Sequence, residues 1–207
     1  MEITLYYAPM SSAGPVVHVL AELDIPHRLV RVDLASGEQR RPEFLALNPN
    51  GRVPTLVVDG GAMFEALAIM QWLGDRFGVE RGLWPAADDP ARRVALAWST
   101  WAYVTFGAAL QRLIFAGSER TPAELHHAGQ VKHVQSELQD LLAILNGRLV
   151  GRSWLLGDSF TLADAIVGNV ILYGTYCGVA VDDHRELRDW LARLQARPAL
   201  QAAWKAD

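Results

Sequence analysis

The chain has 207 residues, 51% of them hydrophobic, so it can bury a substantial core in one large domain or two small ones, and it is not disordered. Its net charge is −4 and it has no long run of Lys or Arg, which makes DNA, RNA and anionic membranes poor partners. The single cysteine, Cys177, excludes an intrachain disulfide and favours the cytoplasm. The first ten residues carry an early acid and lack the positive region and apolar core of a signal peptide, and no apolar run reaches the roughly 18 residues that a membrane helix needs, so we expect neither a signal peptide nor a membrane helix.

The first part of the chain alternates β-prone and helical patterns. A loop, Ala8–Gly14, separates the first strand from the first helix, and Pro15 suits the first turn of that helix. Because a strand, a helix and a second strand follow one another, we expect a βαβ unit with parallel strands. The expected elements are a strand at Ile3–Tyr7, a helix at Val16–Leu23, a strand at Arg28–Leu34 and a short helix at Pro42–Leu47.

The stretch from Asn48 to Met70 carries most of the functional signal. Asn48–Gly51 is a turn, and Pro54 has no N–H to give to a ladder, so it belongs at the start or edge of the strand Thr55–Asp59. A hairpin at Asp59-Gly60-Gly61 leads to a return strand, Ala62–Phe64, and Glu65 opens a helix. The start of this helix is therefore expected beside the backbone of Val53 and Pro54.

Glycines and prolines then interrupt the pattern for about a dozen residues, as in a domain linker, and the remainder is helical. Thr161 and Asp164 have the spacing of a capping box, and Phe160 with Ala165 would form a weak hydrophobic staple. A short β signal remains at Trp154–Leu156. The helices are expected at Pro90 to about Ala116, Thr121 to about Leu149, Leu162 to about Cys177, His184–Ala196 and from Pro198, which together make a helix bundle.

An extended peptide that carries a carboxylate could bind where two strands, an expected cis proline and a helix N-terminus converge. The run from Asn48 to Pro54 and the acid Glu65 resemble the NPxGxVP motif and the acidic-Ser pair of the soluble glutathione transferases, although Ala66 replaces the serine. The capping box resembles one in the same family. The resemblance implies an α/β thioredoxin-like domain (βαβ-α-ββα) followed by an all-α helical bundle, the GST fold. We therefore expect a thioredoxin-like domain at 1–80, a linker at 81–89 and a helical domain at 90–207.

In the family, a hydroxyl or cysteine in the loop after the first strand hydrogen-bonds the sulfur of glutathione and favours its thiolate. Ser11 and Ser12 are the two candidates for this catalytic role. The Pro-Met-Ser sequence resembles the phi-type loop and favours Ser11, whereas counting back from Val19-Leu20, as in the bacterial beta class, favours Ser12. Tyr6 or Tyr7 is a further alternative, and both serines could simply solvate a tight loop.

The resemblance also implies a set of glutathione contacts. Val53, next to Pro54, is expected to pair its main chain with the cysteinyl part of glutathione. Glu65 would meet the γ-glutamyl amino group, and the N–H of Ala66 the carboxylate at that end. The missing hydroxyl at Ala66 is expected to cost ~1.5 to 3 kcal/mol, or about 10- to 100-fold in affinity. Two cations, Arg40 and Arg52, could pair with the glycyl carboxylate.

We therefore expect a cytoplasmic glutathione transferase, a homodimer like its relatives, that joins glutathione to a small hydrophobic electrophile. The alternatives are a binding or scaffold protein without activity, which Ala66 favours, and a glutathione-dependent isomerase, dehalogenase or reductase. No metal is expected, because the histidines at 126, 127 and 133 lack acids at ligand spacing. An electrophile pocket between the domains would be lined by Met10, Trp101, Phe106 and Arg112.

Overall fold

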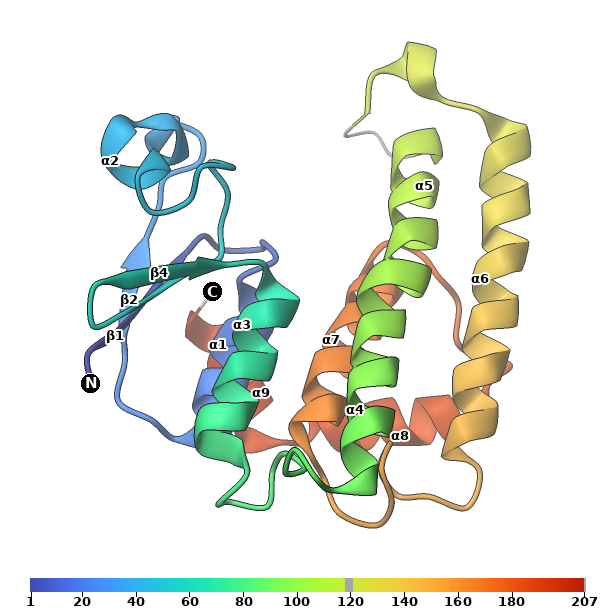
Figure 1. The fold of residues 1–207 in the computed structure, drawn as a ribbon. Coiled ribbons are helices and arrows are strands. Elements are labelled where there is room, and N and C mark those ends of the chain that lie inside the picture. Colours follow the sequence, from blue (N-terminus) through green and yellow to red (C-terminus); the bar gives the residue numbers. More distant parts are fainter. Residues whose placement is uncertain (118–120, 207) are drawn as a thin grey trace. The chain divides into compact units, whose positions relative to one another are not determined.

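A computed structural model describes residues 1–117 and 121–206 of the chain (Figure 1). The chain forms two compact units, one made of Met1–Ala86 with Ala196–Asp207 and the other of Ala87–Gln195. The first contains a sheet and the second is helical, so the α/β and all-α parts of the fold prediction are confirmed.

The first unit is built on a four-stranded mixed sheet with the strand order β2-β1-β3-β4. β1 and β2 are parallel, as the βαβ pattern predicts, while β3 runs antiparallel to both β1 and β4. The two strands beside β1 are shorter than the sequence suggested. β2 ends at Arg31 instead of Leu34, and β3 ends at Val58 instead of Asp59. The elements of this unit are β1 (Ile3–Tyr7), α1 (Gly14–Leu23), β2 (Arg28–Arg31), η1 (Glu38–Arg40), α2 (Pro42–Leu45), β3 (Thr55–Val58), β4 (Gly61–Phe64), α3 (Ala66–Leu73), η2 (Gly74–Gly78) and α9 (Pro198–Ala206).

Successive side chains of a strand point to opposite faces of the sheet, so the apolar side chains of this unit form two layers, one on each face. Leu5 and Leu56 face each other across β1 and β3 and are fully buried, as is Leu20 on α1. On the opposite face, Phe44 of α2 packs in a smaller cluster with Ala8, Val32 and Val53. Figure 1 accordingly shows α1, α3 and α9 gathered on one side of the sheet and α2 on the other.

The helix α9 belongs to the first unit, although the sequence pattern assigned everything from 90 to 207 to the second domain, a range in which 118–120 and 207 lie outside the described residues. It packs against α1. Next to it, Arg197 donates to both oxygens of Glu22 on α1 at 2.6 Å. Glu22 also contacts the ring Nε2 of the buried His18 at 3.1 Å. The linker at 81–89 stays a prediction, but the packing of α9 against α1 shows that the chain returns to its first unit.

The second unit is built from helices. The helix predicted from Pro90 is interrupted by a π-helical turn, and the helix predicted from Thr121 begins at Ala128 after a short 3₁₀ turn. The β signal at Trp154 produces a single isolated bridge to Gly157. Within the described ranges, no helix is long and apolar enough to cross a membrane. The elements are α4 (Pro90–Thr100), η3 (Trp101–Phe106), α5 (Gly107–Gly117), η4 (Ala123–Leu125), α6 (Ala128–Leu149), α7 (Leu162–Tyr176) and α8 (Arg185–Gln195).

The predicted capping box at the start of α7 is present. Its acid, Asp164, is fully buried and accepts hydrogen bonds from the N–H of Thr161 at 2.9 Å and of Leu155 at 2.6 Å. The indole of Trp190 on α8 donates to the same carboxylate at 2.9 Å. Burial raises the pKa of Asp164, and these donors oppose the rise. One carboxylate thus ties the start of α7 to α8 and to the preceding loop.

The ring of Phe160, just before this capping box, packs edge to face against Trp154.

Candidate glutathione-binding site

A buried asparagine organises the turn before β3. The side chain of Asn48, which is 2% exposed, donates to the carbonyl of Arg52 at 2.7 Å and accepts from the N–H of Asn50 at 3.0 Å. Gly51 has a φ of +58°, and a Cβ there would lie 2.8 Å from the carbonyl oxygen of Gln39, so this position needs glycine. The turn delivers Val53 to the start of β3, and the Val53–Pro54 peptide is cis, as predicted.

The backbone of Val53 is bonded within the protein at its carbonyl but not at its N–H. Within residues 1–117 and 121–206, no group accepts a hydrogen bond from its N–H. Its carbonyl accepts one, from the hydroxyl of Ser12 at 2.9 Å. A free N–H beside a C=O at the end of a strand is what an added extended peptide needs.

Both candidate serines lie in the loop between β1 and α1. Ser12 is exposed, while Ser11 is half-buried and donates to the carbonyl of Ala8 at 2.6 Å. The residue before them, Met10, has a φ of +52°, a conformation that a side chain of this kind rarely adopts. The alternative candidates, Tyr6 and Tyr7, are half-buried, and the ring of Tyr6 packs edge to face against Phe44. The loop therefore presents Ser12 toward Val53 and uses Ser11 within itself.

The start of α3 holds the second strained residue of the site. Glu65 has a φ of +72° and a ψ of 112° and is exposed, and no side chain caps the helix. The strain is held in place because β4 ends at Phe64 while the carbonyl of Glu65 already accepts from Ile69 at 3.0 Å. Ala66 is 6% exposed and begins the helix, so its N–H is one of the orphan donors of the first turn. Strain of this kind outside glycine is typical of ligand sites.

Both predicted cations are exposed in the first unit. The described part of the chain offers no hydrogen-bond or ion-pair partner to the guanidinium group of either Arg40 or Arg52. A Cβ on Gly51 would lie 3.4 Å from Cδ of Arg40, so the 3₁₀ turn that carries Arg40 packs on the turn that carries Arg52. Two unpaired positive charges on neighbouring turns suit the binding of a carboxylate.

The residues predicted to line the electrophile pocket have different environments. Met10 is 68% exposed, and Trp101 is half-buried against Trp98 and Phe106. Phe106 has no exposed surface, so it supports the ring of Trp101 from within the core. Arg112 forms an ion pair with Glu137 at 2.6 Å. Burial raises the pKa of Tyr103, which lies in the same π-helical turn. Their role in substrate binding stays a prediction.

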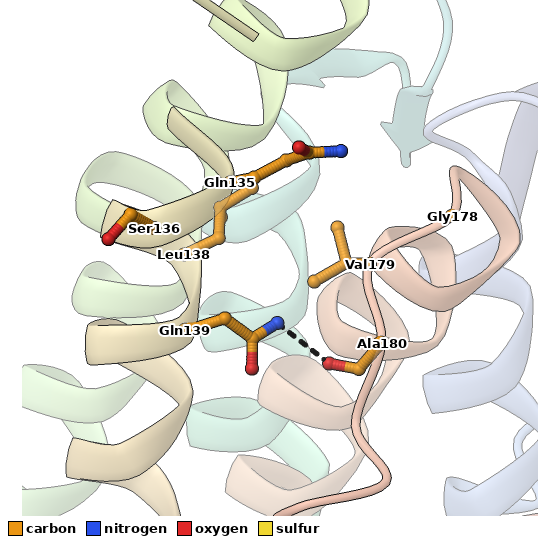
Figure 2. Close-up of a pocket in the computed structure, with 7 residues that line it drawn as sticks. All are labelled: Gln135, Ser136, Leu138, Gln139, Gly178, Val179 and Ala180. Carbon is orange, nitrogen blue, oxygen red and sulfur yellow. Dashed lines mark hydrogen bonds between the residues drawn. The ribbon is translucent and has the colours of Figure 1, made fainter. Parts of the chain in front are cut away.

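The second unit also has two shallow hollows that the sequence did not indicate. One, of about 240 Å³, lies between α6 and the loop after α7, where Gln139 donates to the carbonyl of Ala180 at 2.9 Å (Figure 2). The other, of about 500 Å³, is lined by α5, α6 and α7 and includes Cys177 and the stacked rings of Tyr173 and Tyr176. Among the described residues, the lining of these two hollows includes none of those predicted for the electrophile pocket.

Two parts of the site were missed by the sequence reasoning. Asn48 was read only as a turn residue, although an asparagine that is followed by Pro-Asn-Gly can bond its own turn, and this signal was available. The bond from Ser12 to Val53 joins residues 41 positions apart, and nothing in the sequence signals it. No group of three or more His, Cys, Asp or Glu residues that could hold a metal is found in the ranges that the structure describes.

Comparisons with known proteins identify both units. Residues 11–76 match the model of the glutathione S-transferase N-terminal domain, and residues 113–198 match that of the C-terminal domain. The chain is 31% identical over 214 residues to the disulfide-bond oxidoreductase YfcG of Escherichia coli K12, covering 99% of this chain and 96% of the relative. It is 32% identical over 189 residues to the glutathione S-transferase GstB of the same organism, covering 90% and 89%.

The fold also matches a solved structure with ligand. A glutathione transferase from Burkholderia graminis, with two glutathione molecules bound per subunit, superposes with a TM-score of 0.83 and 28% identity. The match covers 99% of this chain and 88% of the other.

Proposed function

Because the chain belongs to the glutathione S-transferase family, we propose that it conjugates the thiolate of glutathione to a small hydrophobic electrophile. The observation that carries the proposal is the backbone of Val53, whose N–H is unbonded within the described residues and whose carbonyl is met by the exposed hydroxyl of Ser12. An extended cysteinyl residue can pair with this backbone as an added strand and bring its sulfur to the serine loop.

The other contacts fit the two charged ends of glutathione. The exposed carboxylate of Glu65 suits the γ-glutamyl amino group, and the N–H of Ala66 at the start of α3 suits the carboxylate beside it. At the other end, Arg40 and Arg52 offer positive charge to the glycyl carboxylate. The tripeptide would thus be held at its centre by backbone and at its ends by charge.

Activation of the thiol requires a modest free energy. A free thiol has a pKa near ~8.5, and lowering it by roughly two units needs about 2.7 kcal/mol in favour of the thiolate. One hydrogen bond to a charged group supplies ~1.5 to 3 kcal/mol, so a single serine hydroxyl is nearly sufficient. Helix α1 begins at Gly14, where the serine loop ends, and the positive end of its dipole also favours the thiolate.

A disulfide reductase is the second candidate, favoured by the match to YfcG over 99% of this chain. In that reaction two glutathione molecules reduce one disulfide, giving glutathione disulfide and two thiols. Cys177 is the single cysteine of the chain, so the protein has no dithiol of its own, and both reducing thiols are proposed to come from glutathione. The subunits of either enzyme are proposed to form a homodimer.

Calorimetric titration with reduced glutathione near pH 7, followed by two turnover assays, tests these proposals. Conjugation of 1-chloro-2,4-dinitrobenzene supports the transferase, whereas turnover of 2-hydroxyethyl disulfide without conjugation supports the reductase. Arg52→Ala is expected to weaken glutathione binding, and Arg188→Ala is the matched control on an exposed helix surface of the other unit. If the protein neither bound nor used glutathione, both proposals would fail and a binding or scaffold role would take their place.

A further inference from the structure

Three arginines of the second unit, here called the arginine cluster, bond to the loop between α6 and α7. Arg148 donates from Nε to the carbonyl of Leu155 at 3.0 Å, and Arg193 on α8 donates from Nε to the carbonyl of Ser153 at 3.1 Å. Arg152 donates to the carbonyl of Arg148 at 3.0 Å. Because Ser153 and Leu155 are two residues apart, their Cα atoms lie within about 7 Å of each other. Figure 1 shows α8 at the end of this unit where α6 finishes, so two helices bring the three side chains to one loop.

Most of the N–H groups of the arginine cluster have no partner. A guanidinium group has five N–H donors, and Arg148 and Arg193 each use only the one on Nε. Arg152 donates through Nη1 alone, to two carbonyls at the end of α6. Within residues 1–117 and 121–206, no member of the cluster forms an ion pair with a carboxylate or any further hydrogen bond. Capping of the end of α6 therefore accounts for the bonds that exist, but not for the donors that remain.

The positive charges of the cluster act on one another and are not neutralised by acids. Burial and the neighbouring charge of Arg152 lower the pKa of the Arg148 guanidinium. The nearby acids have other roles, since Asp164 is buried and capped by its own donors, and Asp189 on α8 pairs with a different arginine. Asp158, in the same loop, is exposed and lies outside ion-pair distance of the cluster. Like charges held together in this way raise the free energy of the arrangement, and an anion would lower it.

An aromatic ring and the carbonyls hold the cluster in position before any ligand arrives. The Cζ of Arg193 lies 5.9 Å from the centroid of the Trp154 ring, within the range of a cation–π interaction. Phe160 packs edge to face on the same ring, with the centroids 5.2 Å apart. Since each guanidinium group is also fixed by a carbonyl, binding an anion costs less side-chain entropy than it would for unattached surface arginines.

We propose that Arg148, Arg152 and Arg193 form a binding site for the phosphate group of a small molecule. Three guanidinium groups suit a phosphate dianion better than a carboxylate, because phosphate has more charge and more oxygens to accept from planar N–H pairs. The whole chain has a net charge of −4, so this positive charge is local and suits one small anion, not the long polyanion of a nucleic acid. All three residues belong to the second unit, and the inference does not depend on the proposed function.

The test is a titration with inorganic phosphate and with phenyl phosphate at constant ionic strength and about pH 8, where phosphate carries close to two charges. Proton–nitrogen NMR correlation spectra follow the Nε–H signals of the arginines. In the wild type, the signals of Arg148 and Arg193 are expected to shift and to saturate, with a dissociation constant of about 1 mM or lower. Chloride at the same ionic strength is expected to cause no saturable shift.

Two variants of the cluster and one matched control complete the design, and circular dichroism checks that each is folded. Arg152→Gln changes an exposed side chain and should weaken phosphate binding about tenfold, as expected for the loss of a charge-assisted hydrogen bond. Arg193→Lys keeps the charge but loses the planar fork, and should weaken binding a few-fold. Arg188→Gln removes an exposed arginine of α8 that is not in the cluster, and should leave the affinity unchanged.

The two probes also separate the possible sources of the phosphate group. Equal affinity for both supports free phosphate as the ligand, whereas tighter binding of phenyl phosphate supports a small phosphate ester. The inference would be overturned by a wild type that shows no saturable shift, or one that responds to chloride in the same way. Wild-type affinity in both Arg152→Gln and Arg193→Lys would also overturn it, as would an equal loss of affinity in Arg188→Gln.

Discussion

Replacing Arg197 by Met should destabilise the first unit, because the buried carboxylate of Glu22 would lose its cationic partner. The Glu22 side chain is 4% exposed, His18 is fully buried, and the Arg197 side chain is 27% exposed. Removing one partner of a buried ion pair typically costs about 3–5 kcal/mol. We expect the lower end of this range, about 3 kcal/mol, because Arg197 is partly solvated and His18 remains as a partner of Glu22. Met retains much of the apolar stem of arginine, so the change reports mainly on the charge.

The chain offers a matched control for this substitution. Arg185 and Asp189 form an exposed pair at 3.9 Å, with side chains 81% and 52% exposed, so Arg185→Met should cost less than about 0.5 kcal/mol. Thermal unfolding followed by circular dichroism would then show a loss in Tm of about 6–12 °C for Arg197→Met and little change for the control. Glu22→Gln combined with Arg197→Met should recover a large part of the loss, because no unpaired charge remains. Equal losses for the two Arg→Met variants would refute this reasoning.

The pH dependence of the same variant provides a second check. Burial would raise the pKa of Glu22, but the hydrogen bonds from Arg197 and His18 outweigh it and hold the pKa below its usual range. A carboxylate with a lowered folded-state pKa stabilises the fold above its unfolded pKa of about 4.3, and this contribution is lost as the pH falls through the folded-state value. The stability difference between wild type and Arg197→Met should therefore be largest near neutral pH and shrink below about pH 4. A difference that grew in acid would contradict the assignment.

Two further substitutions test the ligand contacts. Ala66→Ser restores a hydroxyl at the start of α3 and should tighten glutathione binding by about 10- to 100-fold in a calorimetric titration; unchanged affinity would mean that the γ-glutamyl carboxylate does not meet this helix end. Gly51→Ala should weaken glutathione binding several-fold, because a Cβ would lie 2.8 Å from the Gln39 carbonyl and displace the turns that carry Arg40 and Arg52. Gly82→Ala is the matched control, since Gly82 has a similar φ of +67° with nothing within 4 Å, and it should lose stability without losing affinity.

The sequence predicted those parts of the fold that depend on local patterns. Alternating apolar residues and turn chemistry placed all four strands, and the parallel pairing of β1 with β2 followed from the βαβ order. The π-helical turn at Trp101–Phe106 was not predictable, because a single added residue in a helix does not change how many apolar residues the segment contains. The return of α9 to α1 depends on a contact between Arg197 and Glu22, 175 positions apart, which local periodicity does not report.

For the candidate site, the sequence predicted where the turns and the helix start would lie, but not which of two neighbouring serines faces Val53. The cis peptide at Val53–Pro54 was expected because an X-Pro bond adopts cis far more readily than other peptide bonds, and the helix start at Glu65 was expected from the apolar positions that follow it. It could not separate Ser11 from Ser12, because two adjacent serines have the same chemistry and only the path of the loop decides which hydroxyl faces Val53. That path turns on the positive φ of Met10, and methionine gives no sign that it will adopt one.

The position of α9 also has a consequence for the order in which the protein is made. Residues 1–86 leave the ribosome first, but the helix that covers α1 is synthesised only after all of 87–195. Until then the apolar side of α1 that α9 covers lacks its partner, and Glu22 lacks its arginine. The first unit to emerge is therefore the last to be completed, whereas the helical unit can form from a continuous stretch of chain.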